Sequence, residues 1–310
     1  MGFILDPLYS IVSGVMIGIH TIVSPVFGTD SGVTWTISIM GLVIIIRTIL
    51  IPLFVKQIKS QRALTALQPH MKAIQSKYKD DRQKQSEEMM KLYKEHKTNP
   101  LASCFPILAQ APIMFALFTV LNGISKHHAH GFMKGDYLQS AANAKFFGAP
   151  IASTFLMSPK DIIDLGGSQT TVRIVTVILI VLMSASTFTT QRQLMTKGMP
   201  KMDASNNMML QQQKIMLYLF PIIFAISGVN FPVGVLIYWS TTNFWTWGQQ
   251  YYVIKRNPAP GSPAYEELQR KKAHKAKLEG REIESEQSPE ASEPQTGQRQ
   301  QPKKAKKKKK

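Results

Sequence analysis

The stretch VTWTISIMGLVIIIRTILIPLFV, Val33–Val55, carries a single charge, Arg47, in a mostly apolar run. A helix needs roughly 20 predominantly apolar residues, at about 1.5 Å each, to cross a bilayer, so this stretch predicts a membrane span. Ile44 lies near its middle, which places Arg47 about 4.5 Å from the centre. An arginine at that depth costs at least about 2.5–3.5 kcal/mol and usually faces a bundle interior or a water-filled cavity. Arg47 is therefore the first candidate functional residue.

Four more apolar blocks follow along the chain, Leu101–Gly123, Thr171–Thr190, Ile215–Asn230 and Pro232–Ile254. They show no alternation of period two, so they predict helices rather than the strands of a barrel. We therefore expect an all-α polytopic membrane protein. The five predicted transmembrane segments are 33–55, 100–123, 170–190, 214–230 and 232–254.

The positive charges are confined to particular segments. Of 37 lysines and arginines, eleven lie in residues 56–97 and sixteen follow Ile254, whereas four lie in residues 126–160 and none precedes Arg47. The positive-inside rule then predicts which segments face the cytoplasm. We expect segments 56–99, 191–213 and 255–310 in the cytoplasm, and segments 1–32 and 124–169 outside. The N-terminus would be extracytoplasmic and the C-terminus cytoplasmic.

The N-terminal segment 1–32 is apolar but interrupted by His20, Ser24 and Pro25, and it has no basic start. A cleaved signal peptide would need that basic start. Residues 2–27 therefore predict an interfacial amphipathic helix. The alternative is a sixth span, which would place an uncharged N-terminus inside.

The charged segment 56–99 predicts a cytoplasmic helical hairpin. Pro69 and the Lys79-Asp80-Asp81 cluster divide it into helices of about 58–78 and 82–97. Apolar residues recur at helical spacing along the first helix and predict one contact face. This face consists of Leu64, Leu67, Met71, Ile74 and Tyr78. Its partner is either another molecule or the second helix of the hairpin.

Polar residues inside the spans are the remaining candidates for a site. They are Gln110, Ser184, Thr187, Tyr238, Trp239 and Thr242. None of the five spans contains Asp or Glu, so Arg47 has no buried carboxylate to pair with. Water must then reach this arginine. We expect a hydrophilic groove that is open to the cytoplasm, closed outside and lined by the polar halves of the third and fifth spans.

Two further motifs lie outside the spans. His127–His130 reads HHAH, but adjacent histidines without carboxylate or cysteine support fit zinc poorly, so no metal or cofactor is predicted. After a Met-rich loop (191–213) and the last span, a helix of about 264–283 is expected, with Ser262 as N-cap and Pro263 at its first position. The low hydrophobicity of the remaining tail predicts disorder.

The basic tail ends in a cluster of lysines that can bind anionic lipids, set topology or bind ribosomal RNA. These residues are Lys303, Lys304, Lys306, Lys307, Lys308, Lys309 and Lys310.

Three sequence motifs are similar to those of the YidC-type membrane protein insertases: RTILIPLFVKQIKSQRALTALQPHMKAIQSKYK, NPLASCFPILAQAPIMFALFTVL and FPVGVLIYWSTTNFWTWGQQ. The resemblance covers about 33–256. It implies an insertase whose five helices form a hydrophilic groove, with Arg47 as the groove arginine. Trp239, with Tyr238 adjacent, would contact substrate, and Val43 would face the same groove one turn before Arg47. The chain departs from many relatives in lacking a large periplasmic domain and a lipoprotein cysteine.

The resemblance implies that the protein inserts nascent membrane proteins into the bacterial plasma membrane. The expected partners are these substrates, the ribosome and anionic lipids, but not DNA; participation of a Sec translocon or of targeting factors is left open. No GxxxxGK[ST] motif occurs, and no enzyme activity is expected. Two alternatives remain: a small-anion transporter or channel that uses Arg47, and a membrane-anchored ribosome or lipid tether.

Overall fold

The structure, a computed structural model, describes residues 2–96, 98, 105–198 and 208–278. Residues up to Glu267 form one compact unit, and a second unit starts at Leu268. The described helices and strands are α1 (Gly2–Phe27), α2 (Gly32–Ile49), α3 (Ile51–Ala66), α4 (Gln68–Lys77), α5 (Arg82–Glu95), α6 (Phe105–Ser125), α7 (Asp136–Asn143), β1 (Lys145–Phe146), β2 (Ala149–Pro150), α8 (Pro159–Asp164), α9 (Gln169–Gln193), α10 (Met208–Gly228), α11 (Val233–Arg256) and α12 (Pro263–Leu278). The prediction of an all-α membrane protein is confirmed.

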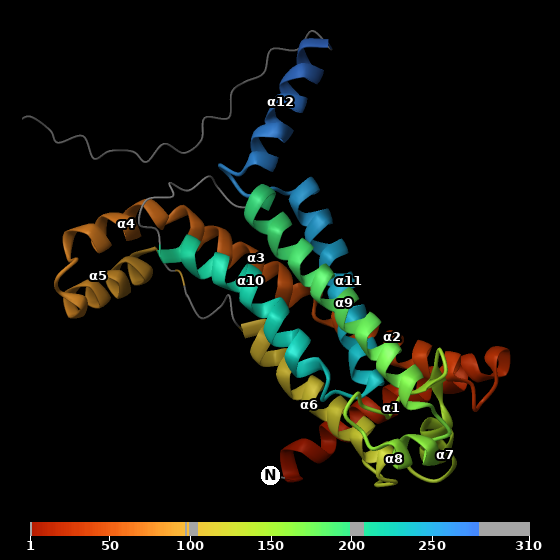
Figure 1. Ribbon diagram of the computed structural model, residues 1–310. Coiled ribbons are helices and arrows are strands. Elements are labelled where there is room, and N and C mark those ends of the chain that lie inside the picture. Colours follow the sequence, from red (N-terminus) through yellow and green to blue (C-terminus); the bar gives the residue numbers. More distant parts are fainter. Residues whose placement is uncertain (1, 97, 99–104, 199–207, 279–310) are drawn as a thin grey trace, which may run out of the picture. The chain divides into compact units, whose positions relative to one another are not determined.

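A bundle of long helices forms the first unit (Figure 1). α9 packs against α10 and α11, and α11 also packs against α2 and α6. The core between them is fully buried and apolar, with Ile39 and Leu42 from α2, Leu117 and Leu121 from α6, and Leu236 from α11. Close packing of these side chains fixes the relative positions of α2 and α11, the two helices from which the candidate site is built.

The predicted span 33–55 covers two helices, because α2 ends at Ile49 and α3 begins at Ile51. Pro52 has no N–H to donate to the helical carbonyl four residues earlier. The chain nevertheless stays helical on both sides, since the Leu50 N–H bonds Ile46 O and the Phe54 N–H bonds Leu50 O at 3.0 Å each. Arg47 therefore lies in the last turn of α2.

The predicted single helix of about 58–78 is divided in two. α3 ends at Ala66 and α4 begins at Gln68, with Pro69 at the start of α4, a position that proline favours. The second helix begins at Arg82 as expected, where the Asp81 carboxylate accepts from the Lys84 N–H at 3.0 Å. α4 and α5 pack against each other.

Residues 2–27 form a helix, α1, which packs against α2 and α6. It crosses the ends of the long helices instead of running alongside them (Figure 1). Its segment Leu5–Phe27 is also long and apolar enough to cross a membrane. The interfacial position of this helix therefore stays a prediction.

Three helical segments in the described part meet the length and hydropathy of a membrane span, Leu5–Phe27, Gly32–Ile49 and Gln169–Gly198. Two shorter apolar helices, Gln110–Ile124 and Lys214–Gly228, accompany them. α11, which carries many polar and aromatic side chains, is not among these segments. The number of five spans thus remains a prediction.

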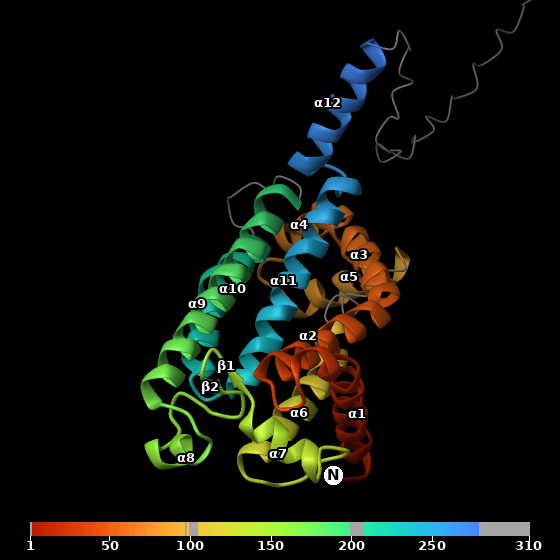
Figure 2. The ribbon, with the colours of Figure 1, turned by 90° about the vertical axis from the view of Figure 1, so that its right-hand side faces the viewer.

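Residues 126–168 fold over one end of the bundle, which we call the capped end (Figure 2). The sequence predicts only an extracytoplasmic location for this segment, whereas the structure shows that it contains α7, α8 and the β1–β2 hairpin. Its carbonyl groups bond the start of α11, where Val233 N–H donates to Ser153 O at 2.9 Å and Gly234 N–H to Ile151 O at 2.8 Å. These bonds satisfy N–H groups that have no partner within the helix.

The cap is also held by α2. The Trp35 indole N–H donates to Ser140 Oγ at 3.0 Å, and the Ser140 hydroxyl donates to Thr29 O at 2.8 Å. Gly32 lies directly against the backbone of Lys145, so a side chain at residue 32 would overlap the Lys145 carbonyl.

In α12, the N-cap prediction is confirmed, because the Tyr265 N–H donates to Ser262 Oγ at 3.2 Å and the helix begins at Pro263. The predicted helix end at about 283 lies outside the described residues.

Gly32→Ala is expected to destabilise the protein by about 1–3 kcal/mol, as overpacking of a rigid contact does, because the new methyl group meets backbone rather than a movable side chain. Thermal unfolding in detergent measures this. Gly248→Ala is the control, since nothing lies within 4 Å of the added methyl group there, and a helical Gly→Ala change stabilises slightly. Equal unfolding midpoints for the two variants would contradict the packing of the cap on α2.

Candidate functional site

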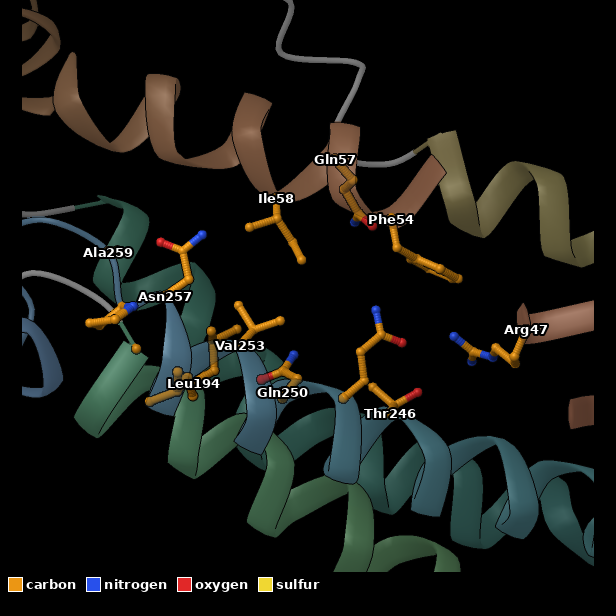
Figure 3. A pocket seen from close by; sticks show the side chains of 14 residues that line it. Arg47, Phe54, Gln57, Ile58, Leu194, Thr246, Gln250, Val253, Asn257 and Ala259 are labelled. Carbon is orange, nitrogen blue, oxygen red and sulfur yellow. The ribbon is translucent and has the colours of Figure 1, made fainter. Parts of the chain in front are cut away.

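A cavity of about 220 Å³ lies between α3 and the second half of α11, at the end of the bundle opposite the capped end (Figure 3). α11 starts at the cap and ends here, so we call this end the open end. The lining residues are Arg47, Phe54, Gln57, Ile58, Leu194, Gly198, Thr246, Gln249, Gln250, Val253, Ile254, Asn257, Pro258 and Ala259. They come from α2, α3, α11, the π-helical turn Leu194–Gly198 that follows α9, and residues 257–259 that follow α11.

Arg47 is buried, with 9% of its surface exposed, and forms one wall of the cavity. Its guanidinium carbon lies 5.1 Å from the centre of the Phe54 ring on α3, a cation–π contact. Ion pairs join Lys84 to Asp81 and Lys91 to Glu88 on the hairpin, whereas Arg47 forms none with the described residues. The Nε atom of Arg47 is buried and has no hydrogen-bond partner among the described residues.

One face of α11 carries polar side chains all the way from the bundle interior to the open end. Tyr238, Thr242, Thr246 and Gln250 recur every four residues and so share a face of this helix. Figure 3 shows Thr246 and Gln250 on the same side of the cavity, across from the α3 residue Phe54. This polar face lies within an otherwise apolar bundle.

Several buried polar atoms near this face have no hydrogen-bond partner among the described residues. They are Gln110 Oε1, Gln250 Oε1 and Arg47 Nε. Leaving such an atom unsatisfied costs about 1–3 kcal/mol, and natural proteins satisfy nearly all of them with protein groups or ordered water. These atoms are therefore available to water or to the polar groups of a ligand.

The structure brings some of the predicted residues together at the inner end of this face. The Gln110 amide of α6 donates to the Tyr238 hydroxyl of α11, and Arg47 of α2 lies near the same phenol. Tyr238 is buried. Gln110, Tyr238, Thr242 and Arg47 thus belong to one polar region shared by three helices.

Two other predicted residues do not line the cavity. Val43 is 1% exposed and packs in the apolar core. The Trp239 ring lies against Phe224 at 4.7 Å and Phe231 at 5.7 Å between centroids, so it faces α10 and the turn that follows it.

Ser184 and Thr187 connect helices rather than lining the cavity. The Ser184 hydroxyl donates to the Pro221 carbonyl of α10 at 3.4 Å. The Asn243 amide of α11 donates to Thr187 Oγ1 at 3.1 Å and to Met183 O at 3.3 Å. These bonds hold α9 against both neighbours, which is the usual role of polar side chains between membrane helices.

Part of the predicted contact face of the hairpin packs against the second helix of the hairpin. The Tyr93 hydroxyl of α5 donates to Met71 Sδ of α4 at 3.9 Å, and Leu67 is buried. Burial raises the pKa of the Tyr93 phenol. Leu64, Ile74 and Tyr78 are half-buried. The terminal lysines predicted to bind ribosome or lipid lie outside the described residues.

Sequence reasoning missed the amides near the open end, Gln57, Gln249 and Gln250, and it also missed Thr246. The spacing of four residues from Tyr238 through Thr242 and Thr246 to Gln250 is present in the sequence. Extending that periodicity beyond the middle of the span would have identified Thr246 and Gln250, two of the four missed residues. Gln57 could not be found in this way, because it lies on another helix.

Comparisons with known proteins agree on one family. The family model described as "60Kd inner membrane protein" matches residues 26–260. Proteins named "Membrane protein insertase YidC" are 54% identical over 274 residues in Streptomyces avermitilis, 35% over 280 residues in Tropheryma whipplei and 32% over 271 residues in Mycobacterium tuberculosis. These alignments cover 87%, 87% and 81% of this chain and 64%, 89% and 73% of the relatives, respectively.

A solved structure, "Active YidC insertase crystal structure with the first transmembrane domain resolved", is also similar. Its sequence is 24% identical, and the match covers 78% of this chain and 46% of that chain, with a TM-score of 0.47. Together with the apolar helices, the relatives identify a multi-pass membrane protein.

A cysteine introduced at Thr246 is expected to react quickly with a water-soluble, charged methanethiosulfonate, because the reactive thiolate forms only where water reaches it. The background is Cys104→Ser, which removes the one native cysteine, and the protein is placed in nanodiscs. Phe244→Cys is the control: residue 244 is 53% exposed but lies on the opposite face of α11. We expect a rate about tenfold or more higher at residue 246. Equal rates would exclude a water-filled groove along this face.

Proposed function

Because the chain belongs to the family of the 60Kd inner membrane protein, we propose that it is a membrane protein insertase. In this proposal it admits hydrophilic segments of nascent membrane proteins into the groove beside Arg47 and releases their transmembrane helices into lipid. The observation that carries the proposal is the buried Arg47 in the wall of a cavity that amide and hydroxyl side chains also line, without a carboxylate partner among the described residues. Such a cation is available to a ligand that enters from the open end.

The proposed cycle begins when a short polar end or loop of a substrate enters at the open end, which the positive-inside rule predicts to face the cytoplasm. The amides of Gln249 and Gln250 and the hydroxyl of Thr246 lie along its path. They can exchange hydrogen bonds with peptide groups of any sequence, because peptide N–H and C=O are obligatory hydrogen-bonding groups. Arg47 adds one charge, which favours segments that carry Asp or Glu.

The groove shortens the distance that polar groups must travel through hydrocarbon. Each unsatisfied backbone group in lipid costs several kilocalories per mole, so a polar path across part of the membrane lowers the barrier. The apolar helix of the substrate then moves into lipid. Its burial is favourable by about 25 cal/mol for each square ångström of apolar surface removed from water. No covalent bond is made or broken, and the proposal requires no enzyme activity or cofactor.

The proposal includes an orientation and partners. The N-terminus and the capped end would be extracytoplasmic, with the hairpin and the basic tail in the cytoplasm of a bacterial cell. The tail would hold the ribosome near the open end through its RNA phosphates, and it would also attract anionic lipids.

Arg47→Ala is expected to lower the initial rate of insertion about tenfold or more for a single-span substrate with an acidic translocated segment. This corresponds to loss of a charged hydrogen bond of about 1.5–3 kcal/mol. Insertion of a substrate with a neutral translocated segment should be slowed less, and the Arg47→Lys variant should largely keep its insertion activity. Insertion into liposomes containing the purified protein, scored by protease protection, measures this.

Arg173→Ala is the matched control, because Arg173 is the other arginine within a predicted span but is exposed near the start of α9, where it contacts the Phe155 ring. The Arg173→Ala variant should insert the substrate at the same rate as the unchanged protein. Equal losses for Arg47→Ala and Arg47→Lys would contradict a role for the charge. Liposomes that move a small anion but fail to insert the substrate would favour the transporter alternative over the insertase.

Replacement of the tail lysines 303–310 by glutamine is expected to weaken ribosome association at physiological salt and to flatten its salt dependence, because fewer phosphates are neutralised. Insertion of a substrate released from the ribosome should be unaffected. Deletion of the same residues is the companion variant and should match the glutamine variant if charge, not length, matters. Unchanged sedimentation of the glutamine variant with ribosomes would remove the tail from this role.

A further inference from the structure

The β1–β2 hairpin of the cap ends in an exposed aromatic residue. The pairing of Lys145 with Pro150 and of Phe146 with Ala149 leaves Phe147 and Gly148 as a two-residue turn. Both turn residues have positive φ, +48° and +82°, as in the type I′ turns that favour Asn-Gly. A bulky residue is strained in this region, and Phe147 is also 81% exposed. Backbone strain at an exposed apolar side chain is a reason to look for a ligand.

The hairpin has a fixed position on the bundle. Its first strand lies against Gly32 at the start of α2, and a methyl group at Gly148 would lie 3.3 Å from Thr171 Cγ2 in the first turn of α9. Figure 2 shows the hairpin between the lower ends of α2 and α9. The tip is therefore at the level where the two apolar helices begin.

The tip also continues an apolar stripe of α9. Thr171, Ile174, Ile178 and Leu182 share one helical face, and the last three side chains are exposed. α9 is part of a segment long and apolar enough to cross a membrane, so its exposed apolar side chains face lipid. Phe147 stands where this lipid-facing stripe reaches the capped end.

We infer that the hairpin inserts Phe147 into the lipid interface and thereby anchors the cap to the membrane. Thr171 is the third residue of α9, so the tip lies only about 3 Å along the axis from the start of the helix. Aromatic side chains are enriched at that depth. Phe146 supports the tip, because its ring packs against the Phe147 ring at 4.7 Å between centroids, edge to face. A lipid acyl chain would cover the apolar surface that water otherwise contacts.

The unchanged protein tests the inference. It is placed in nanodiscs of phosphatidylcholine and phosphatidylglycerol that contain a phospholipid with a diazirine in its acyl chain. After illumination, mass spectrometry locates the labelled residues. We expect residues 146–148 to be labelled about as strongly as Ile174 and Ile178, and several-fold more strongly than α7, which belongs to the same cap. Labelling of the hairpin no stronger than that of α7 would overturn the inference.

Two substitutions test the role of the aromatic side chain. Asn accepts positive φ, so Phe147→Asn should keep the turn while losing the apolar contact, and labelling of residues 146–148 should fall to the level of α7. Phe147→Trp should keep the labelling. Unfolding midpoints close to that of the unchanged protein establish that both variants fold. Undiminished labelling in Phe147→Asn would overturn the anchor, because the tip would then reach lipid without the phenyl ring.

Discussion

A guanidinium inside a membrane helix must be solvated by something, and this requirement determines how the helices around Arg47 are arranged. The five predicted spans contain no carboxylate, and the arginine contacts an aromatic ring and a cavity that amide and hydroxyl side chains also line. α11 therefore cannot be a uniformly apolar helix. It places Tyr238, Thr242, Thr246 and Gln250 on the side that faces the arginine. The apolar core of α2, α6 and α11 keeps this polar face at a fixed distance from Arg47.

The two ends of the bundle have opposite properties. At the capped end, backbone hydrogen bonds from residues 151 and 153 occupy the start of α11, and a close backbone contact at Gly32 leaves no room between cap and helix. At the open end, two of the lining side chains, Arg47 and Gln250, have buried polar atoms without a hydrogen-bond partner among the described residues. In the proposed function, a substrate segment would enter at the open end and find no equivalent exit at the capped end. This asymmetry favours a proposal of sideways release into lipid over one of passage through a pore.

Composition and periodicity were enough to predict the helical class and to single out Arg47, because a charge in an apolar run is visible without any tertiary information. The surroundings of Trp239, Ser184 and Thr187 were harder to predict. Each is polar or amphipathic within a span, but one packs on aromatic rings and two bond neighbouring helices. Whether such a side chain meets a helix or a cavity depends on which elements lie across from it, and Gln57 belongs to the site only because α3 lies across the cavity from α11. The ordered cap was missed for the same reason, since its bond from Trp35 to Ser140 joins residues 105 positions apart.

The break after α2 has an electrostatic consequence. Because Pro52 cannot donate to the preceding turn, α2 ends close to Arg47, and the carbonyl groups of its last turn carry partial negative charge. The backbone thus offsets part of the arginine's charge. Unlike a carboxylate, a helix terminus cannot form a bidentate ion pair that an arriving chain would have to displace. The proline allows the protein to keep a buried cation that is partly stabilised and still free to bind.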